Sequence, residues 1–147
     1  MVDFEVIKNE SVKDLRVTED NLLEASMSSA LISTKYLSWH MDYNRYYQSI
    51  IKEKDKLKLL LNLYYTGKAT ADQITAVGMS KPFTLKIDKV ADIDMFIVSN
   101  HKYVEIDNLI NEVKEQLRYI ESVLDSLKFR HIVIKNTIDW KRFQNGC

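Results

Sequence analysis

Basic side chains occur together with aromatic rings in two segments of the chain, residues 43–68 and residues 128–146. Positive charge binds phosphate, and proteins that bind single-stranded nucleic acid add flat rings on which bases stack. The candidates for contact with DNA are Arg45, Lys52, Lys54, Lys56, Lys58, Lys68 and the ring of Tyr65 in the first segment, and Arg130, Lys135, Lys141 and Arg142 in the second. The same lysines would also serve simply to solvate the polar face of a helix, so the residues alone leave both interpretations open.

The formal charge of the whole chain is zero, but the charge is unevenly distributed. Residues 1–30 carry a net charge of −4, whereas residues 31–68 and residues 128–147 each carry +4. Interactions between exposed charges are screened beyond about 8–10 Å, so each basic segment acts on its own surroundings. A neutral chain of this kind can therefore still hold a polyanion.

Residue patterns that support catalysis or metal binding are missing from the sequence. His40, His101 and His131 each stand apart from other metal-ligating residues, and no glycine-rich phosphate loop or nucleophile motif occurs. The one cysteine, Cys147, has no partner for an internal disulfide, which is typical of a cytosolic protein. We therefore expect a protein that is not an enzyme and that carries neither a metal nor another cofactor.

The elements that must position the basic side chains are predicted to be long helices, and the fold class to be all-α. Residues 22–65 contain neither Gly nor Pro, and the spacing of their apolar residues predicts a helix over about 20–66. Its heptad seam includes Tyr36, Trp39, Tyr43, Ile50, Leu57, Leu60 and Tyr64. A helix this long exceeds the width of a compact domain of this size. We expect it either to break near residues 41–44 or to pack against other copies of the chain, and we favour self-association.

A second helix is predicted over about 100–127, capped by Ser99 or Asn100, from an unbroken repeat of apolar residues at steps of three and four. That seam consists of Ile106, Ile110, Val113, Leu117, Ile120, Leu124 and Leu127. Residues 128–146 are predicted to form a separate basic helix, in which Trp140 and Phe143 join the residues of the oligomer interface. We expect residues 1–147 to form a single helical domain, without a membrane-spanning segment.

The remaining segments are predicted to be shorter or irregular. Residues 1–18 are expected to be partly disordered or to contain a short helix that starts at Ser11. Residues 68–99 are expected to form a connector with two short helices. A capping box at Thr70–Gln73 opens one of them, and Asp88 caps the other. Gly67 is the expected end of the first long helix, because glycine readily adopts the left-handed conformation of a helix C-cap.

Several short motifs, taken in order, resemble the UvsY family of recombination mediators from T-even-type bacteriophages, including its cyanophage-type members. The segments that carry the resemblance are Lys35-Tyr36-Leu37-Ser38-Trp39-His40, Leu63-Tyr64-Tyr65-Thr66-Gly67-Lys68, Lys81-Pro82-Phe83-Thr84-Leu85-Lys86, Asp92-Ile93-Asp94-Met95-Phe96-Ile97, Arg130-His131-Ile132-Val133-Ile134-Lys135 and residues 138–146. Together they cover about residues 20–146, which is most of the chain.

The resemblance implies an all-helical protein without enzymatic activity that forms closed homohexamers or homoheptamers. It implies binding to single-stranded DNA, to a RecA-like phage recombinase and to the phage single-strand binding protein, in the cytoplasm of an infected bacterial host. Such a protein helps the recombinase assemble on DNA during recombination, repair and recombination-dependent replication. Arg130, Lys135 and Lys141 match the basic positions of the family's ending.

One difference from the family concerns a Lys-x-Arg-Leu element that precedes the tyrosine pair and is implicated in DNA binding. In this chain Leu59, Leu60 and Leu61 occupy its place, and we expect Lys52, Lys54, Lys56 and Lys58 to supply the charge instead. The alternative function is a coiled-coil scaffold or adaptor that does not bind nucleic acid.

Overall fold

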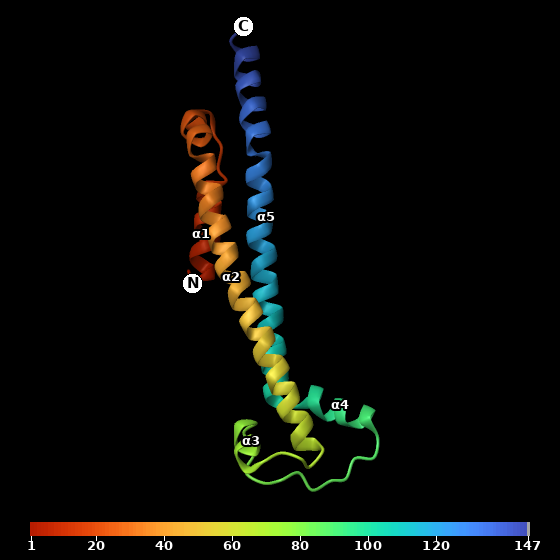
Figure 1. Cartoon of the computed structure of the whole chain (residues 1–147). Helices are drawn as coiled ribbons and strands as arrows, with labels where there is room; N and C mark the ends of the chain where they lie inside the picture. The colour runs from red at the N-terminus through yellow and green to blue at the C-terminus, as the bar shows by residue number, and fades with distance from the viewer. Residues whose placement is uncertain (147) are drawn as a thin grey trace. The chain divides into compact units, whose positions relative to one another are not determined.

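The computed structural model describes residues 1–146, and these residues form helices joined by short connections, except for a long loop between α3 and α4 (Figure 1). In chain order the elements are α1 (Phe4–Asp14), the 3₁₀ helix η1 (Glu19–Asn21), α2 (Leu22–Tyr65), α3 (Ala71–Ala76), α4 (Val90–Ser99) and α5 (His101–Gln144). No strand occurs within residues 1–146, so the predicted all-α class is confirmed. In this described part of the chain, no helix is both long enough and apolar enough to cross a bilayer.

The chain divides into two compact units, and both long helices contribute to each of them. The first unit contains Met1–Arg45 and the chain from Glu115 onward, and the second contains Tyr46–Lys114. The first unit therefore holds α1, the first half of α2 and most of α5. The second unit holds the remainder of the two long helices together with α3 and α4.

In the first unit, α1 packs against both long helices. The ring of Phe4 lies 6.4 Å from that of Tyr43 and 5.4 Å from that of Tyr119, and Ile7 is fully buried. The Ser11 hydroxyl lies 2.6 Å from the Tyr119 hydroxyl. The expected helix start at Ser11 is therefore wrong: α1 begins at Phe4, where the Asp3 carboxylate accepts a hydrogen bond from the Glu5 N–H, and Ser11 is buried within it.

Asp14, the last residue of α1, attaches that helix to both of its neighbours. Its carboxylate accepts hydrogen bonds from Lys35 Nζ at 2.6 Å and from the Tyr36 hydroxyl at 2.9 Å. Its main-chain carbonyl accepts a hydrogen bond from the Arg130 guanidinium on α5. Burial lowers the pKa of Lys35, but hydrogen bonds to Asp14 and Glu10 outweigh burial and leave the pKa raised. Burial, followed by the hydrogen bond to Asp14, raises the pKa of Tyr36.

Helix α2 runs without interruption through residues 41–44, so the alternative of a break at these residues is excluded. It begins after a capping box formed by Thr18 and Asn21 and ends at Tyr65, where Gly67 has a φ of +73°. Tyr36, Tyr43 and Ile50 are buried within one chain. The chain's own helices therefore cover these three seam positions, and their burial does not require a sister chain.

The core of the second unit forms around the end of α2. Its buried residues are Leu61, Tyr64, Tyr65, Ile74, Val77, Ile93 and Ile97. The extended connector, residues 77–89 between α3 and α4, places Phe83 against the tyrosine pair, with ring centroids 5.0 Å from Tyr65 and 5.6 Å from Tyr64. The predicted capping box of α3 is confirmed at Thr70 and Gln73. The predicted cap at Asp88 is wrong: α4 begins after Lys89, without a side-chain cap.

Helix α5 is continuous from His101 to Gln144, so the predicted boundary between residues 127 and 128 does not exist. Its predicted cap at Asn100 is confirmed, because the Asn100 side-chain oxygen accepts a hydrogen bond from the Lys102 N–H at 3.0 Å. The buried seam residues are Ile110, Val113, Leu117, Ile120 and Leu127. Val123 is buried instead of Leu124, which is half-buried. The reason is that Val123 shares its face of the helix with Tyr119 and Arg130, both of which contact α1.

Candidate nucleic-acid interface

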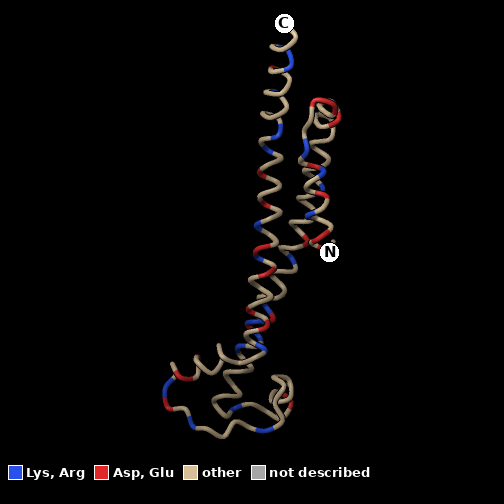
Figure 2. Tube along the Cα trace, turned by 180° about the vertical axis from the view of Figure 1, so that it is seen from behind, with Lys and Arg blue, Asp and Glu red and all other residues tan. Residues whose placement is uncertain are grey.

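A basic groove lies in the first unit between the start of α2 and the last turns of α5. It has a volume of about 420 Å³. We call it the tail groove and define it by its polar lining, which consists of Ser26, Ser29, His131, Lys135, Asp139 and Arg142. Figure 2 shows lysine and arginine residues recurring along this end of α5. Its two cations, Lys135 and Arg142, outnumber its one carboxylate, Asp139, so the groove is suited to oxyanions such as phosphate.

The groove forms because each helix supplies one wall. Lys135, Asp139 and Arg142 follow each other at steps of four and three on α5, so they share a face of that helix. Ser26 and Ser29, three residues apart, share a face of α2 in the same way. The floor is apolar and includes Leu127, Ile134 and Ile138.

Several basic residues of the α5 tail are available to a ligand. Lys135, Lys141 and Arg142 are exposed, and none of them forms an ion pair within residues 1–146. Lys128, by contrast, is paired with Asp125 at 2.8 Å. Arg130 is 5% exposed, and its Nε has no hydrogen-bond partner in the described chain. The guanidinium of Arg130 thus holds α1 in place, although sequence comparison placed this residue among the DNA contacts.

The basic residues of α2 also differ in whether an acidic side chain already pairs with them. In the second unit Lys52, Lys56, Lys58 and Lys68 are exposed and form no ion pair among the described residues. Lys54 is paired with Asp107 and lies 5.0 Å from the centre of the Tyr103 ring. The hydrogen bond to Asp107 raises the pKa of Lys54, against the opposing effect of burial. In the first unit Arg45 is exposed and paired with Asp42 at 3.2 Å.

Leu59, Leu60 and Leu61 have distinct environments. Leu59 is exposed, Leu60 packs at the edge of the core of the second unit, and Leu61 is fully buried in it. Charge at the position of Leu61 would be costly, because a buried unpaired charge loses its hydration. The free cations of this helix are therefore found upstream, at Lys52, Lys56 and Lys58.

Tyr65, the aromatic candidate for stacking on a base, lies in the core. Tyr65 is buried among Tyr64, Phe83 and Phe96, and its hydroxyl accepts a hydrogen bond from the Asn100 side-chain amide at 3.2 Å. Its ring is therefore not available for stacking on a base in this structure. Phe83 and Phe96, which bury it, come from later segments of the chain, so the residues around Tyr65 in the sequence do not reveal its burial.

The residues predicted to form the oligomer interface differ in how far one chain buries them. Tyr36, Tyr43, Ile50, Tyr64, Ile110, Val113, Leu117, Ile120 and Leu127 are buried within one chain, and Trp39, Leu57, Leu60, Ile106 and Leu124 are half-buried. Trp140 and Phe143 are 57% and 73% exposed, and their rings stack with a centroid distance of 5.7 Å. Only these two of the predicted residues present large exposed rings.

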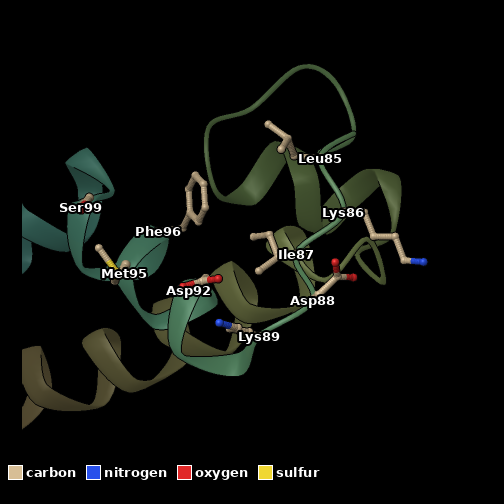
Figure 3. A pocket seen from close by; sticks show the side chains of 9 residues that line it. All are labelled: Leu85, Lys86, Ile87, Asp88, Lys89, Asp92, Met95, Phe96 and Ser99. Carbon is tan, nitrogen blue, oxygen red and sulfur yellow. The ribbon is translucent and has the colours of Figure 1, made fainter.

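A second cavity, in the second unit, has the wrong chemistry for phosphate. It lies between the extended connector and α4, has a volume of about 600 Å³, and is lined by Leu85, Ile87, Met95 and Phe96 (Figure 3). Two lysines and two aspartates stand around it, so it gathers no net positive charge. In Figure 3 the Lys86 side chain points away from the hollow.

Sequence reasoning missed His131, Ser26 and Ser29 as parts of the groove. The available signal was the spacing of four between His131 and Lys135, which places both on one face of a helix. No sequence signal brings the two serines to that face, because the pairing of α2 with α5 is a tertiary contact.

The family model described as recombination, repair and single-stranded DNA binding protein UvsY matches residues 10–147. The chain belongs to the UvsY family. Among curated proteins, no sequence match is found. Crystal structures of the recombination mediator protein UvsY from bacteriophage T4 share the fold of the chain. Lattice type II matches with a TM-score of 0.81 and 17% identity over 99% of both chains. Lattice type IV matches with a TM-score of 0.81 and 18% identity, over 97% of this chain and 99% of the other.

The UvsY family is described by recombination, repair and single-stranded DNA binding. Membership of this family confirms the resemblance drawn from the short motifs. It does not favour the scaffold alternative, because the family is described by DNA binding.

Proposed function

We propose that this protein is a recombination mediator that binds single-stranded DNA. It helps load a RecA-like phage recombinase onto DNA that is covered by the phage single-strand binding protein, in the cytoplasm of the infected host. The observation that carries the proposal is the family match over residues 10–147. The unpaired cations of the tail groove and of α2 support it, because positive charge without an internal partner is free to neutralise phosphate.

The tail groove is the main phosphate contact in this proposal. Lys135 and Arg142 bind phosphate oxygens, the Ser26 hydroxyl donates a further hydrogen bond, and Lys141 adds charge beside them. The exposed Lys52, Lys56 and Lys58 of α2 form a second set of contacts. Base stacking contributes less than the pattern of basic and aromatic residues predicted, because Tyr65 lies in the core.

The proposal includes assembly into a closed ring of six or seven chains. A ring multiplies weak contacts, because each tethered subunit meets the DNA at an effective concentration on the order of mM. DNA held against such a surface is bent, which weakens the grip of the single-strand binding protein and offers the strand to the recombinase. The exposed Trp140 and Phe143 support this assembly, since large exposed rings often mark an interface.

Fluorescence anisotropy with a labelled oligonucleotide tests DNA binding directly. We expect saturable binding at low salt, with an affinity that falls by about 0.7 logarithmic units per phosphate contact for each tenfold rise in salt. An absence of binding at low salt would support the scaffold alternative. The loading step is tested by recombinase filament formation on DNA coated with the single-strand binding protein, which we expect this protein to accelerate.

A further inference from the structure

The extended connector between α3 and α4 has main-chain groups without hydrogen-bond partners. Residues 82–89 belong to no helix or strand, and neither the N–H nor the carbonyl of residues 83–87 forms a hydrogen bond within residues 1–146. Just before them, the Lys81 carbonyl accepts a hydrogen bond from the Tyr64 hydroxyl at 3.3 Å. An extended segment with free main-chain groups along its edge is a template on which another extended segment can pair.

The side chains of the connector alternate as they do in a β-strand. Phe83 and Ile87 are half-buried and pack against the core of the second unit, whereas Thr84 and Lys86 are exposed. In Figure 3 the Ile87 side chain extends toward the hollow beside Phe96, and Lys86 points away from it. The connector therefore resembles a single strand, and within residues 1–146 no second strand pairs with it.

Two pockets lie along this segment. The apolar pocket is the cavity of about 600 Å³ described above, and Leu85 and Ile87 belong to its lining. The polar pocket has a volume of about 310 Å³, and Lys81 and Phe83 belong to its lining. The midpoints of these two residue pairs are four residues apart, which is about 13 Å along an extended chain. Residues four apart share one face of a strand, so a paired strand can place one side chain in each pocket.

The two pockets differ in the side chains that suit them. On the α4 side the apolar pocket is lined by Met95 and Phe96, so it favours a large apolar side chain. The polar pocket presents the Lys81 ammonium and the Ser80 and Thr84 hydroxyls, none of which has a partner within residues 1–146. Among the described residues of this lining Lys81 alone is charged, so charge complementarity favours an acidic side chain.

We propose that the connector receives an extended segment of a partner protein, which pairs with it as a second strand. That segment carries a large apolar side chain for the apolar pocket and, four residues away, an aspartate or glutamate for the polar pocket. Main-chain hydrogen bonds to the connector supply affinity, and the two pockets supply specificity. The site belongs to the second unit, goes beyond the proposed function and does not depend on DNA binding.

Selection from a displayed library of random nine-residue peptides on the native chain tests the proposal. We expect the enriched peptides to carry a large apolar residue and an acidic residue four positions apart. A labelled synthetic peptide of the enriched sequence is then titrated by fluorescence anisotropy. Met95→Asp should weaken its binding at least about tenfold, because the peptide's apolar side chain would bury the new charge. Met95 is 67% exposed, so this variant should fold like the native chain.

Val98→Asp is the matched control, because Val98 is 54% exposed on the same helix and does not line the apolar pocket. It should bind the peptide with native affinity. If no peptide is enriched, or if Met95→Asp binds the peptide as tightly as the native chain does, the proposal is wrong.

A charge exchange tests the polar pocket. Lys81→Glu should weaken binding of the peptide, because its acidic residue then faces a like charge. Replacing that acidic residue with lysine should restore affinity for the variant. Native affinity of Lys81→Glu for the original peptide would refute the acidic side chain assigned to this pocket.

Hydrogen exchange distinguishes strand pairing from occupation of the apolar pocket alone. Amides of residues 83–87 should exchange rapidly in the free chain, and the bound peptide should slow those on the paired edge at least about tenfold. A bound peptide without this protection would overturn the strand pairing. Protection of the same amides by an oligonucleotide, or by a higher concentration of the native chain alone, would assign the surface to DNA or to a second copy and contradict the proposal.

Discussion

Removing the charge of the tail groove should weaken DNA binding by a calculable amount. The perturbation is the double substitution of Lys135→Gln and Arg142→Gln. Both side chains are exposed, line the groove and have no ion pair among the described residues, so each is free to neutralise one phosphate. At about 0.7 per contact, the log–log slope of affinity against salt should become shallower by about 1.4 for each subunit that contacts DNA.

The same relation gives the loss of affinity. At 0.1 M salt, one decade below a 1 M reference, two lost contacts reduce the association constant about 25-fold per contacting subunit. The assay is fluorescence anisotropy of a labelled oligonucleotide, titrated at several salt concentrations. Circular dichroism and sedimentation should be unchanged, since the two side chains do not take part in the core.

Lys128→Gln is the matched control for this experiment. Lys128 is on the same helix and is exposed, but Asp125 at 2.8 Å already compensates its charge, and it does not line the groove. We expect Lys128→Gln to change the log–log slope of affinity against salt by much less than the value of about 0.7 for one phosphate contact. If the double variant binds DNA with the native affinity and slope, the groove is not the phosphate site and the argument from unpaired cations fails there.

Three further predictions concern the second DNA-binding surface, the core and pH. Lys56→Glu should weaken oligonucleotide binding and leave sedimentation unchanged, because the residue is exposed and unpaired in the described chain; native affinity in this variant would remove α2 from the DNA interface. Leu61→Ala should lower the free energy of unfolding by about 2–5 kcal/mol, because the Leu61 side chain is 0% exposed and its loss leaves a cavity. Leu59→Ala should have little effect, because Leu59 is 62% exposed. Equal effects in denaturant titrations would contradict this packing. Burial and the hydrogen bond to Asp14 raise the pKa of Tyr36. An unfolded tyrosine has a pKa of about 10, so below this pH the neutral Tyr36 contributes its full stability to the folded state. That contribution is lost as the pH rises above about 10. Tyr36→Phe should therefore make unfolding less dependent on pH above about 10, and an unchanged alkaline profile would refute that cause.

Much of the fold could be predicted from short-range patterns. The capping box at Thr70 and Gln73 and the glycine at the end of α2 depend on a few adjacent residues, and both were predicted correctly. The continuity of α5 was not, because the β-branched residues near Ile132 disfavour a helix only weakly, and packing of the tail against α2 outweighs this preference. The start of α1 was missed because the segment has little periodicity, and burial of Ile7 and Phe4 against other helices decides it.

The candidate site was predictable in its residues but not in its arrangement. Sequence indicated basic residues in two segments, and the UvsY motifs indicated what they bind. Only the structure distinguishes the free Lys135 and Arg142 from the buried Arg130, because a contact with α1 decides that difference.

The sequence by itself determined that the chain is helical, where α2 ends and α3 begins, and that the chain belongs with single-strand DNA-binding recombination proteins. These properties follow from residue types at fixed spacings, which act along one segment. Tertiary structure alone decided which apolar face of each long helix the chain buries and which it leaves open, and that Tyr65 is a core residue. The physical reason is that one helix can carry two apolar faces, and only contact with segments distant in sequence determines which of them is covered.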